Sequence, residues 1–175
     1  QSAYKHKPDL TSLGKIIGGG FPIGAFAGSN EVMEILNPSG DKYRFSLSGT
    51  FSANPVSITA GKVAIELFDR EAVENVNNLS LIAQNQIIEA GKIAGLPVCT
   101  TGKGSMFKIH FKDVPPVCFR DAYEDPATKR IMNMFLEHVY EKGVIMINSC
   151  SCVLSTVIGQ KEIDVLSDVV LSGFK

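Results

Sequence analysis

The sequence has 175 residues, of which 45% are hydrophobic and 20% are charged, and its formal net charge is -1. A chain of this length can build one sizeable core or two small lobes. The near-neutral charge argues against nucleic acid as a partner, because proteins that bind its phosphates concentrate Lys and Arg. No apolar run approaches the roughly 20 residues that cross a bilayer, so a membrane is not an expected partner either.

The first third of the chain predicts strands and tight turns, followed by helices. Residues 9 to 28 alternate short apolar runs with glycine, which suits strands better than a helix. Residues 30 to 36 predict one or two helical turns with Asn30 as the N-cap. A further helix is expected over residues 56 to 68, with Pro55 in its first turn.

A long amphipathic helix is predicted over residues 71 to 94, and Gly95 is its natural stop. Its apolar positions recur at intervals of three and four residues, and we expect them to face a core. They are Val76, Leu79, Ile82, Ala83, Ile87, Ala90 and Ala94.

The last part of the chain predicts a compact α/β lobe. Strands are expected in the stretches PVCTT, SMFKIHF, VIMI and CVLST. One helix is expected in PATKRIMNMFLEHVYEKG, ended by Gly143, and another in the closing stretch QKEIDVLSDVVLSGF.

Lys15 is the first candidate functional residue, in DLTSLGKIIGGGFPIGAFAG (9 to 28). Desolvation by Ile16 and Ile17 would favour the neutral amine that a covalent catalyst needs. The glycines at 18 to 20 would let the backbone pass close to a bound cofactor, as a Schiff-base lysine in a pyridoxal phosphate enzyme requires. On spacing alone, an ordinary surface lysine beside a glycine-rich turn is the better explanation.

A second candidate site is SLSGTFSANP, residues 46 to 55. A Ser-Gly-Thr turn ahead of a helix that begins with proline offers backbone N–H groups and a hydroxyl to an anion. The same residues also suit a loop whose Ser and Thr side chains bind their own backbone.

Together the two segments resemble the class III aminotransferases, which are fold type I pyridoxal phosphate enzymes, and most of all the glutamate-1-semialdehyde 2,1-aminomutases. The resemblance runs along nearly the whole chain and is most specific in the first segment. The stretches that carry it are PDLTSLGKIIGGGFPIGAFAGSNEVMEIL, SGTFSANPVSITAGKVAIE, GKGSMFKIHF and EKGVIMINSCSCVLSTVIGQKEIDVL.

The resemblance implies a role for three residues. Lys15 would form the Schiff base with pyridoxal 5'-phosphate through its ε-amine, and would then move the proton as general base and acid. Thr50, with the backbone of Gly49, would bind the cofactor phosphate. In this family the threonine reaches the active site of the neighbouring subunit, which implies a homodimer acting on a small-molecule amino substrate.

The resemblance also implies an α/β fold, the C-terminal part of fold type I. Residues 1 to 70 would complete the large cofactor-binding domain, 71 to 95 would be a bridging helix, and 96 to 175 the small C-terminal domain. The chain begins without Met, so we expect a fragment of a protein at least about twice as long. The aspartate that pairs with the pyridine nitrogen and the aromatic that stacks on the ring would lie upstream, so we expect the 175 residues alone to be inactive and prone to aggregate.

Several alternatives remain open within this family. The stretch NSCSCVLSTVIG departs from the aminomutase pattern, so an ordinary transaminase that uses a 2-oxo acid is the alternative activity, with a racemase a distant third. A dimerising relic without catalysis is the alternative from another class. Cys150 and Cys152 could line the substrate entrance, although buried thiols are the better interpretation.

Other functions fit the residues less well. Lys15 precedes the glycines instead of following them, and position 23 is Ile23 where a dinucleotide-binding pattern needs glycine. Arg120 is expected in a solvated loop and not as a clamp for a substrate carboxylate. Metal binding is not expected, because the three histidines have no ligand spacing, and reduced cysteines predict a cytoplasmic protein.

Overall fold

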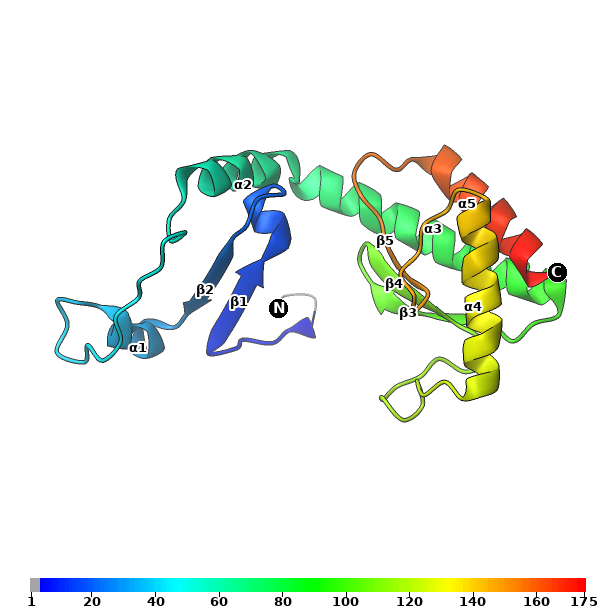
Figure 1. Ribbon diagram of the computed structural model, residues 1–175, viewed down its shortest axis with the longest axis horizontal. Helices are drawn as coiled ribbons and strands as arrows, with labels where there is room; N and C mark the ends of the chain where they lie inside the picture. Colours follow the sequence, from blue (N-terminus) through cyan, green and yellow to red (C-terminus); the bar gives the residue numbers. More distant parts are fainter. Residues whose placement is uncertain (1–3) are drawn as a thin grey trace. The chain divides into compact units, whose positions relative to one another are not determined.

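The computed structural model describes residues 4–175, which fall into two compact units that divide between Asp69 and Arg70 (Figure 1). Residues 1–3, where the first predicted domain begins, lie outside the described residues. None of the helices between residues 4 and 175 combines the length and the apolar character needed to cross a bilayer.

The first unit begins with an antiparallel hairpin that holds Lys15 at its turn. Strand β1 (Leu10–Gly14) pairs with β2 (Gly24–Gly28), in a register that runs from Leu10 opposite Gly28 to Gly14 opposite Gly24. A single 3-10 turn, η2 (Lys15–Gly18), follows β1 directly. The predicted strands and tight turns over residues 9 to 28 are therefore confirmed.

Two helical segments complete the first unit. Residues 30 to 36 are helical as predicted, as α1 (Asn30–Met33) and η3 (Glu34–Leu36), but Asn30 is not the N-cap. Ser29 is the cap, because its backbone is extended and its Oγ accepts a hydrogen bond from the Val32 N–H at 3.4 Å.

Helix α2 (Pro55–Leu67) confirms the second helix predicted in this unit. Pro55 occupies its first turn, where the missing N–H of proline costs no hydrogen bond. The side-chain oxygen of Asn54 accepts hydrogen bonds from the N–H groups of Val56 at 3.0 Å and Ser57 at 3.2 Å. Asn54 is therefore the N-cap of α2, a role that the sequence analysis did not assign.

The second unit opens with the long helix α3 (Arg70–Ala94), whose amphipathic pattern is largely confirmed. Five of the seven apolar positions expected in the core are buried, namely Val76, Leu79, Ala83, Ile87 and Ala90. Ile82 is 38% exposed and lies off the buried face. Gly95 adopts the left-handed conformation at φ 69° and ends the helix as predicted.

A three-stranded antiparallel sheet follows, in the order β3 (Cys99–Lys103), β4 (Met106–His110) and β5 (Ser151–Val153). The predicted strand VIMI (144 to 147) is wrong. Its first N–H, on Val144, bonds the carbonyl of Val139 at the end of the preceding helix, and the N–H of Ile147 bonds the carbonyl of Ser151 at 3.4 Å across a tight turn. Ile147 therefore bonds the first residue of β5, but residues 144 to 147 form no continuous ladder with a strand.

Helices α4 (Pro126–Glu141) and α5 (Gln160–Phe174) confirm the two remaining helical predictions. In Figure 1, α5 runs alongside α3, and Ser167 of α5 donates a hydrogen bond to Gln86 of α3 at 2.6 Å. The core of this unit is formed by buried apolar side chains of the three helices and β4, among them Ile87, Ile109, Val139, Ile163 and Val170.

Candidate functional site

Lys15 occupies a strained and exposed position at the end of β1. Its φ is 56°, in the left-handed region that non-glycine residues rarely adopt. Its side chain is exposed, and within residues 4–175 its amine forms no hydrogen bond or ion pair. Strained backbone of this kind persists only where the surrounding structure holds it, and it concentrates at functional sites.

The apolar neighbours of Lys15 do not enclose it. Ile16 is 62% exposed, and Ile17 is only partly buried. The tight turn η2 directs Ile16 to the surface, so these two side chains do not supply the desolvation expected from the sequence. A dry environment for the amine has to come from atoms beyond these two residues.

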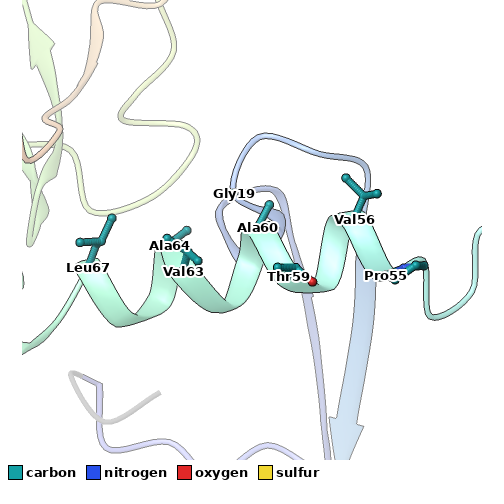
Figure 2. Close-up of a pocket in the computed structure, with 8 residues that line it drawn as sticks. All are labelled: Gly19, Pro55, Val56, Thr59, Ala60, Val63, Ala64 and Leu67. Carbon is teal, nitrogen blue, oxygen red and sulfur yellow. The ribbon is translucent and has the colours of Figure 1, made fainter.

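Two of the three glycines after Lys15 serve packing within the protein, which corrects the expectation that all three make room for a cofactor. A Cβ on Gly18 would lie 2.7 Å from Cγ2 of Ile23, and a Cβ on Gly19 would collide with the carbonyl of Ala60 in α2. Only Gly20 has open space, since a Cβ there would meet nothing within 4 Å. Figure 2 shows Gly19 beside Ala60 on α2.

A second close approach joins the Lys15 turn to the same helix. Gly61 is buried in α2, and a Cβ there would fall on the carbonyl oxygen of Ile17 and within 3.3 Å of the Cα of Gly18. Gly61 is not among the site residues predicted from the sequence. A glycine inside a helix destabilises it by about 1 kcal/mol relative to alanine, and that cost is the feature that could have drawn attention to it.

The loop that carries Gly49 and Thr50 is built from successive tight turns. The N–H of Ser52 bonds the carbonyl of Gly49 at 2.9 Å, and the N–H of Asn54 bonds the carbonyl of Phe51 at 3.2 Å. Ala53 has φ 55°, so it too is a non-glycine residue with left-handed backbone in this unit. Thr50 is exposed, and its hydroxyl and N–H have no hydrogen-bond partner among residues 4–175.

Two open grooves of the first unit lie close to these loops, and Lys15 lines neither of them. One, of about 740 Å³, is lined by a face of α2 and by Gly19, as Figure 2 shows. The other, of about 720 Å³, lies between residues 22–25, the Gly49 loop and the first turn of α2. Gly49 lines this second groove, so the structure associates the predicted phosphate-binding loop with a cavity, but no described interaction joins Lys15 to Gly49 or Thr50.

The cysteines and Arg120 of the second unit do not form a functional site of their own. All four cysteines are free, and burial raises the pKa of the Cys150 thiol to about 11 and that of Cys152 to about 12, as expected for inert thiols. Arg120 is exposed in a loop, as predicted. No group of three His, Cys, Asp or Glu side chains between residues 4 and 175 could hold a metal ion.

The free groups of the first unit suit a phosphorylated aldehyde. Lys15 offers a primary amine for the carbonyl carbon, and Gly49 and Thr50 offer N–H groups and a hydroxyl for the phosphate, with nothing in residues 4–175 competing for them. The donor chemistry therefore fits pyridoxal phosphate, whose aldehyde reacts with a primary amine and whose phosphate accepts hydrogen bonds.

Comparison with known proteins identifies the family to which this fold belongs. The family model described as aminotransferase class-III matches residues 1–168. The glutamate-1-semialdehyde 2,1-aminomutase of Methanobrevibacter smithii is 37% identical over 135 residues, which are 77% of this chain and 31% of that protein.

Solved structures give the same result. An omega-transaminase from Sphaerobacter thermophilus superposes with a TM-score of 0.96 at 33% identity, over 99% of this chain and 40% of that chain. A beta-phenylalanine aminotransferase from Variovorax paradoxus superposes with a TM-score of 0.88 at 27% identity, over 98% of this chain and 39% of that chain.

The architecture is thus that of an α/β transferase of fold type I, of which the chain holds one part. Within this class, the chain belongs to the class III aminotransferase family. It spans about a third of the length of the curated relative and two fifths of the solved ones.

Proposed function

We propose that the chain is the part of a pyridoxal-phosphate-dependent aminotransferase that carries the cofactor lysine, Lys15. The observation that carries this proposal is the exposed, unpartnered amine on a strained backbone position whose turn is packed against α2. Pyridoxal phosphate, when bound, acts as the electron sink for carbanion chemistry at an amino substrate. Lys15 would hold it covalently and move the proton at the substrate carbon, while Thr50 and Gly49 would hold its phosphate.

The specific activity that we propose is isomerisation of an amino aldehyde, as in the 2,1-aminomutases. It is supported by the 37% identity to the Methanobrevibacter smithii aminomutase. Ordinary transamination to a 2-oxo acid is the second candidate, favoured by the TM-score of 0.96 to an omega-transaminase. A requirement for a 2-oxo acid separates the two, because an aminomutase needs no external amino acceptor.

The proposal extends to assembly and location. We propose a homodimer in which Thr50 binds the phosphate at the neighbouring subunit's cofactor, because Thr50 is exposed and no interaction joins it to Lys15 within residues 4–175. The four free thiols support a reducing compartment, and we place the protein in the cytoplasm.

The test uses the chain joined to the upstream region that its relatives possess. The protein is mixed with pyridoxal phosphate, reduced with borohydride and mapped by peptide mass spectrometry. We expect an absorbance band that borohydride abolishes, with the pyridoxyl group on Lys15. Lys15→Ala should lose both the band and catalysis. A pyridoxyl group on another lysine, or no band at all, would leave the family fold without its chemistry and would favour the non-catalytic relic.

A further inference from the structure

We propose that Gly61 is a positioning residue for Lys15, because the absence of a side chain at position 61 lets the turn that begins with Lys15 lie directly on α2. This inference rests on the proposed function, since it takes Lys15 to be the cofactor lysine. Gly61 itself touches neither cofactor nor substrate in this proposal. It acts through the backbone of Ile17 and Gly18.

The contact at Gly61 is between backbones. The position that a Cβ would occupy is filled by the carbonyl oxygen of Ile17, and the Cα of Gly18 lies 3.3 Å from it. A flexible side chain could turn away from an added methyl group, whereas these atoms belong to η2 itself. Alanine at position 61 therefore has to move the turn away from α2.

A second contact, one residue earlier along α2, fixes the same turn. Gly19 closes η2 in the left-handed conformation at φ 57°, with its N–H bonded to the carbonyl of Ile16 at 3.1 Å. A Cβ on Gly19 would collide with the carbonyl of Ala60. The C-terminal end of η2 and its cap thus meet two consecutive residues of the helix, Gly61 and Ala60, and Figure 2 shows Gly19 beside Ala60.

Lys15 has little freedom to compensate for a shift of this turn. It directly follows Gly14, which is held opposite Gly24 in the β1–β2 ladder. It already has φ 56°, and left-handed geometry at a lysine needs support from its surroundings. Ile17, whose carbonyl faces Gly61, is only two residues further on. A displacement at Ile17 therefore passes to the backbone from which the lysine side chain extends.

A shift of the Lys15 turn should slow the reaction, because covalent catalysis needs the reacting groups in a precise geometry. A misplacement of about 1 Å in a reacting group can lower the rate about a hundredfold. An amine carried on a displaced backbone would meet the carbonyl carbon of the cofactor less often and at a poorer angle. The effect should fall on the rate of the chemical step more than on substrate binding.

The experiment compares Gly61→Ala with Gly91→Ala, in the chain joined to the upstream region of its relatives. Gly91 is also a buried helical glycine, but a Cβ there would meet side-chain atoms of Val98 at 2.7 Å, in the other unit. We measure the melting temperature, the rate at which borohydride fixes pyridoxal phosphate on Lys15, and kcat and KM. We expect Gly61→Ala to lower the labelling rate and kcat by about a hundredfold with a smaller change in KM, and Gly91→Ala to lower only the melting temperature.

The outcomes distinguish this inference from the function on which it rests. Equal labelling and kcat in Gly61→Ala and the unsubstituted protein would overturn the inference alone. No label on Lys15 in the unsubstituted protein would overturn the proposed function as well. If Gly61→Ala does not fold, Ala60→Val is the alternative variant, because the larger side chain would crowd Gly19. The same labelling rate, kcat and KM are measured for it. Normal labelling in Ala60→Val would then overturn the inference, and slowed labelling would support it.

Discussion

Two residues with strained backbone lie in the segments that carry the proposed chemistry. Between residues 4 and 175, four non-glycine residues have left-handed backbone: Lys5, Lys15, Ala53 and Cys150. Lys15 is the proposed cofactor lysine, and Ala53 lies three residues after Thr50. Left-handed geometry costs an ordinary residue about 1–2 kcal/mol, so packing elsewhere in the unit has to hold both. The contacts of α2 with Gly19 and with Ile17 are part of that packing.

A buried histidine gives the second unit a defined response to acid. His110 is 4% exposed, and its Nε2 lies 2.7 Å from the Oγ1 of Thr101. Burial lowers the pKa of His110 below its ordinary value of 6.5, and Lys108 and Lys112 lower it further while Glu124 raises it. The folded protein therefore keeps the ring neutral at a pH where the unfolded chain already binds a proton.

The free energy of unfolding should fall as the pH falls below about 6.5, because protons then favour the unfolded state. The slope from this one group cannot exceed about 1.4 kcal/mol per pH unit, and it ends below the folded pKa. Urea unfolding of the protein and of His110→Gln between pH 7 and pH 5 measures this slope. We expect the substituted protein to have a shallower acid slope, and an unchanged slope would show that His110 is not the group responsible.

At the scale of elements, the helices were the most predictable parts of the fold, because their ends carry local chemistry. Proline in the first turn indicated α2, and Gly95 indicated the end of α3. The same kind of reasoning placed the N-cap one residue late at Asn30, since Ser and Asn are both good caps and only the extended backbone of Ser29 decides between them.

The errors concerned features that depend on partners distant in sequence. The run at 144 to 147 has strand composition but forms no continuous ladder with a strand, which its composition alone cannot reveal. The glycines at 18 to 20 predict space for a ligand, whereas Ile23 and Ala60 occupy the space beside Gly18 and Gly19. Lys15, Gly49 and Thr50 came from resemblance to a family, since their spacing alone favoured ordinary explanations.

The cap of α2 supports a prediction at this scale. Asn54 accepts from the N–H groups of Val56 and Ser57, so Asn54→Ala should destabilise the start of the helix by about 1 kcal/mol. Amide hydrogen exchange at Val56 and Ser57 measures the effect directly. Asn54→Ser is the matched control and should retain most of the protection, because serine is a comparable cap. Equal loss in both variants would mean that the side-chain oxygen is not what holds the helix start.

At the scale of the whole molecule, the proposed dimer makes a prediction that a monomer does not. Each site would take its lysine from one subunit and Thr50 from the other. A mixture of Lys15→Ala and Thr50→Val subunits would then contain dimers with one complete site and one site that lacks both groups. Loss of a hydrogen bond to a charged group weakens binding by about 1.5–3 kcal/mol, so Thr50→Val alone should bind pyridoxal phosphate about tenfold or more weakly.

The mixture of variants distinguishes a site that takes Thr50 from the neighbouring subunit from a site that uses the threonine of its own subunit. Only the Thr50→Val subunit retains Lys15, so borohydride labelling at limiting pyridoxal phosphate reports on that subunit alone. We expect its labelling to recover when Lys15→Ala subunits are added, because these supply an intact Thr50. Labelling that stays as weak as in Thr50→Val alone would show that each subunit uses its own threonine.

The contact between α2 and the Lys15 turn also limits how the sequence can vary. The atoms that fill the space at Gly61 belong to the main chain of Ile17 and Gly18, and the main chain is common to all amino acids. No second substitution can make those atoms smaller. In genetic terms, a mutation that replaces Gly61 should have no single second-site suppressor among the residues of the turn. A screen for revertants should recover glycine at position 61 itself.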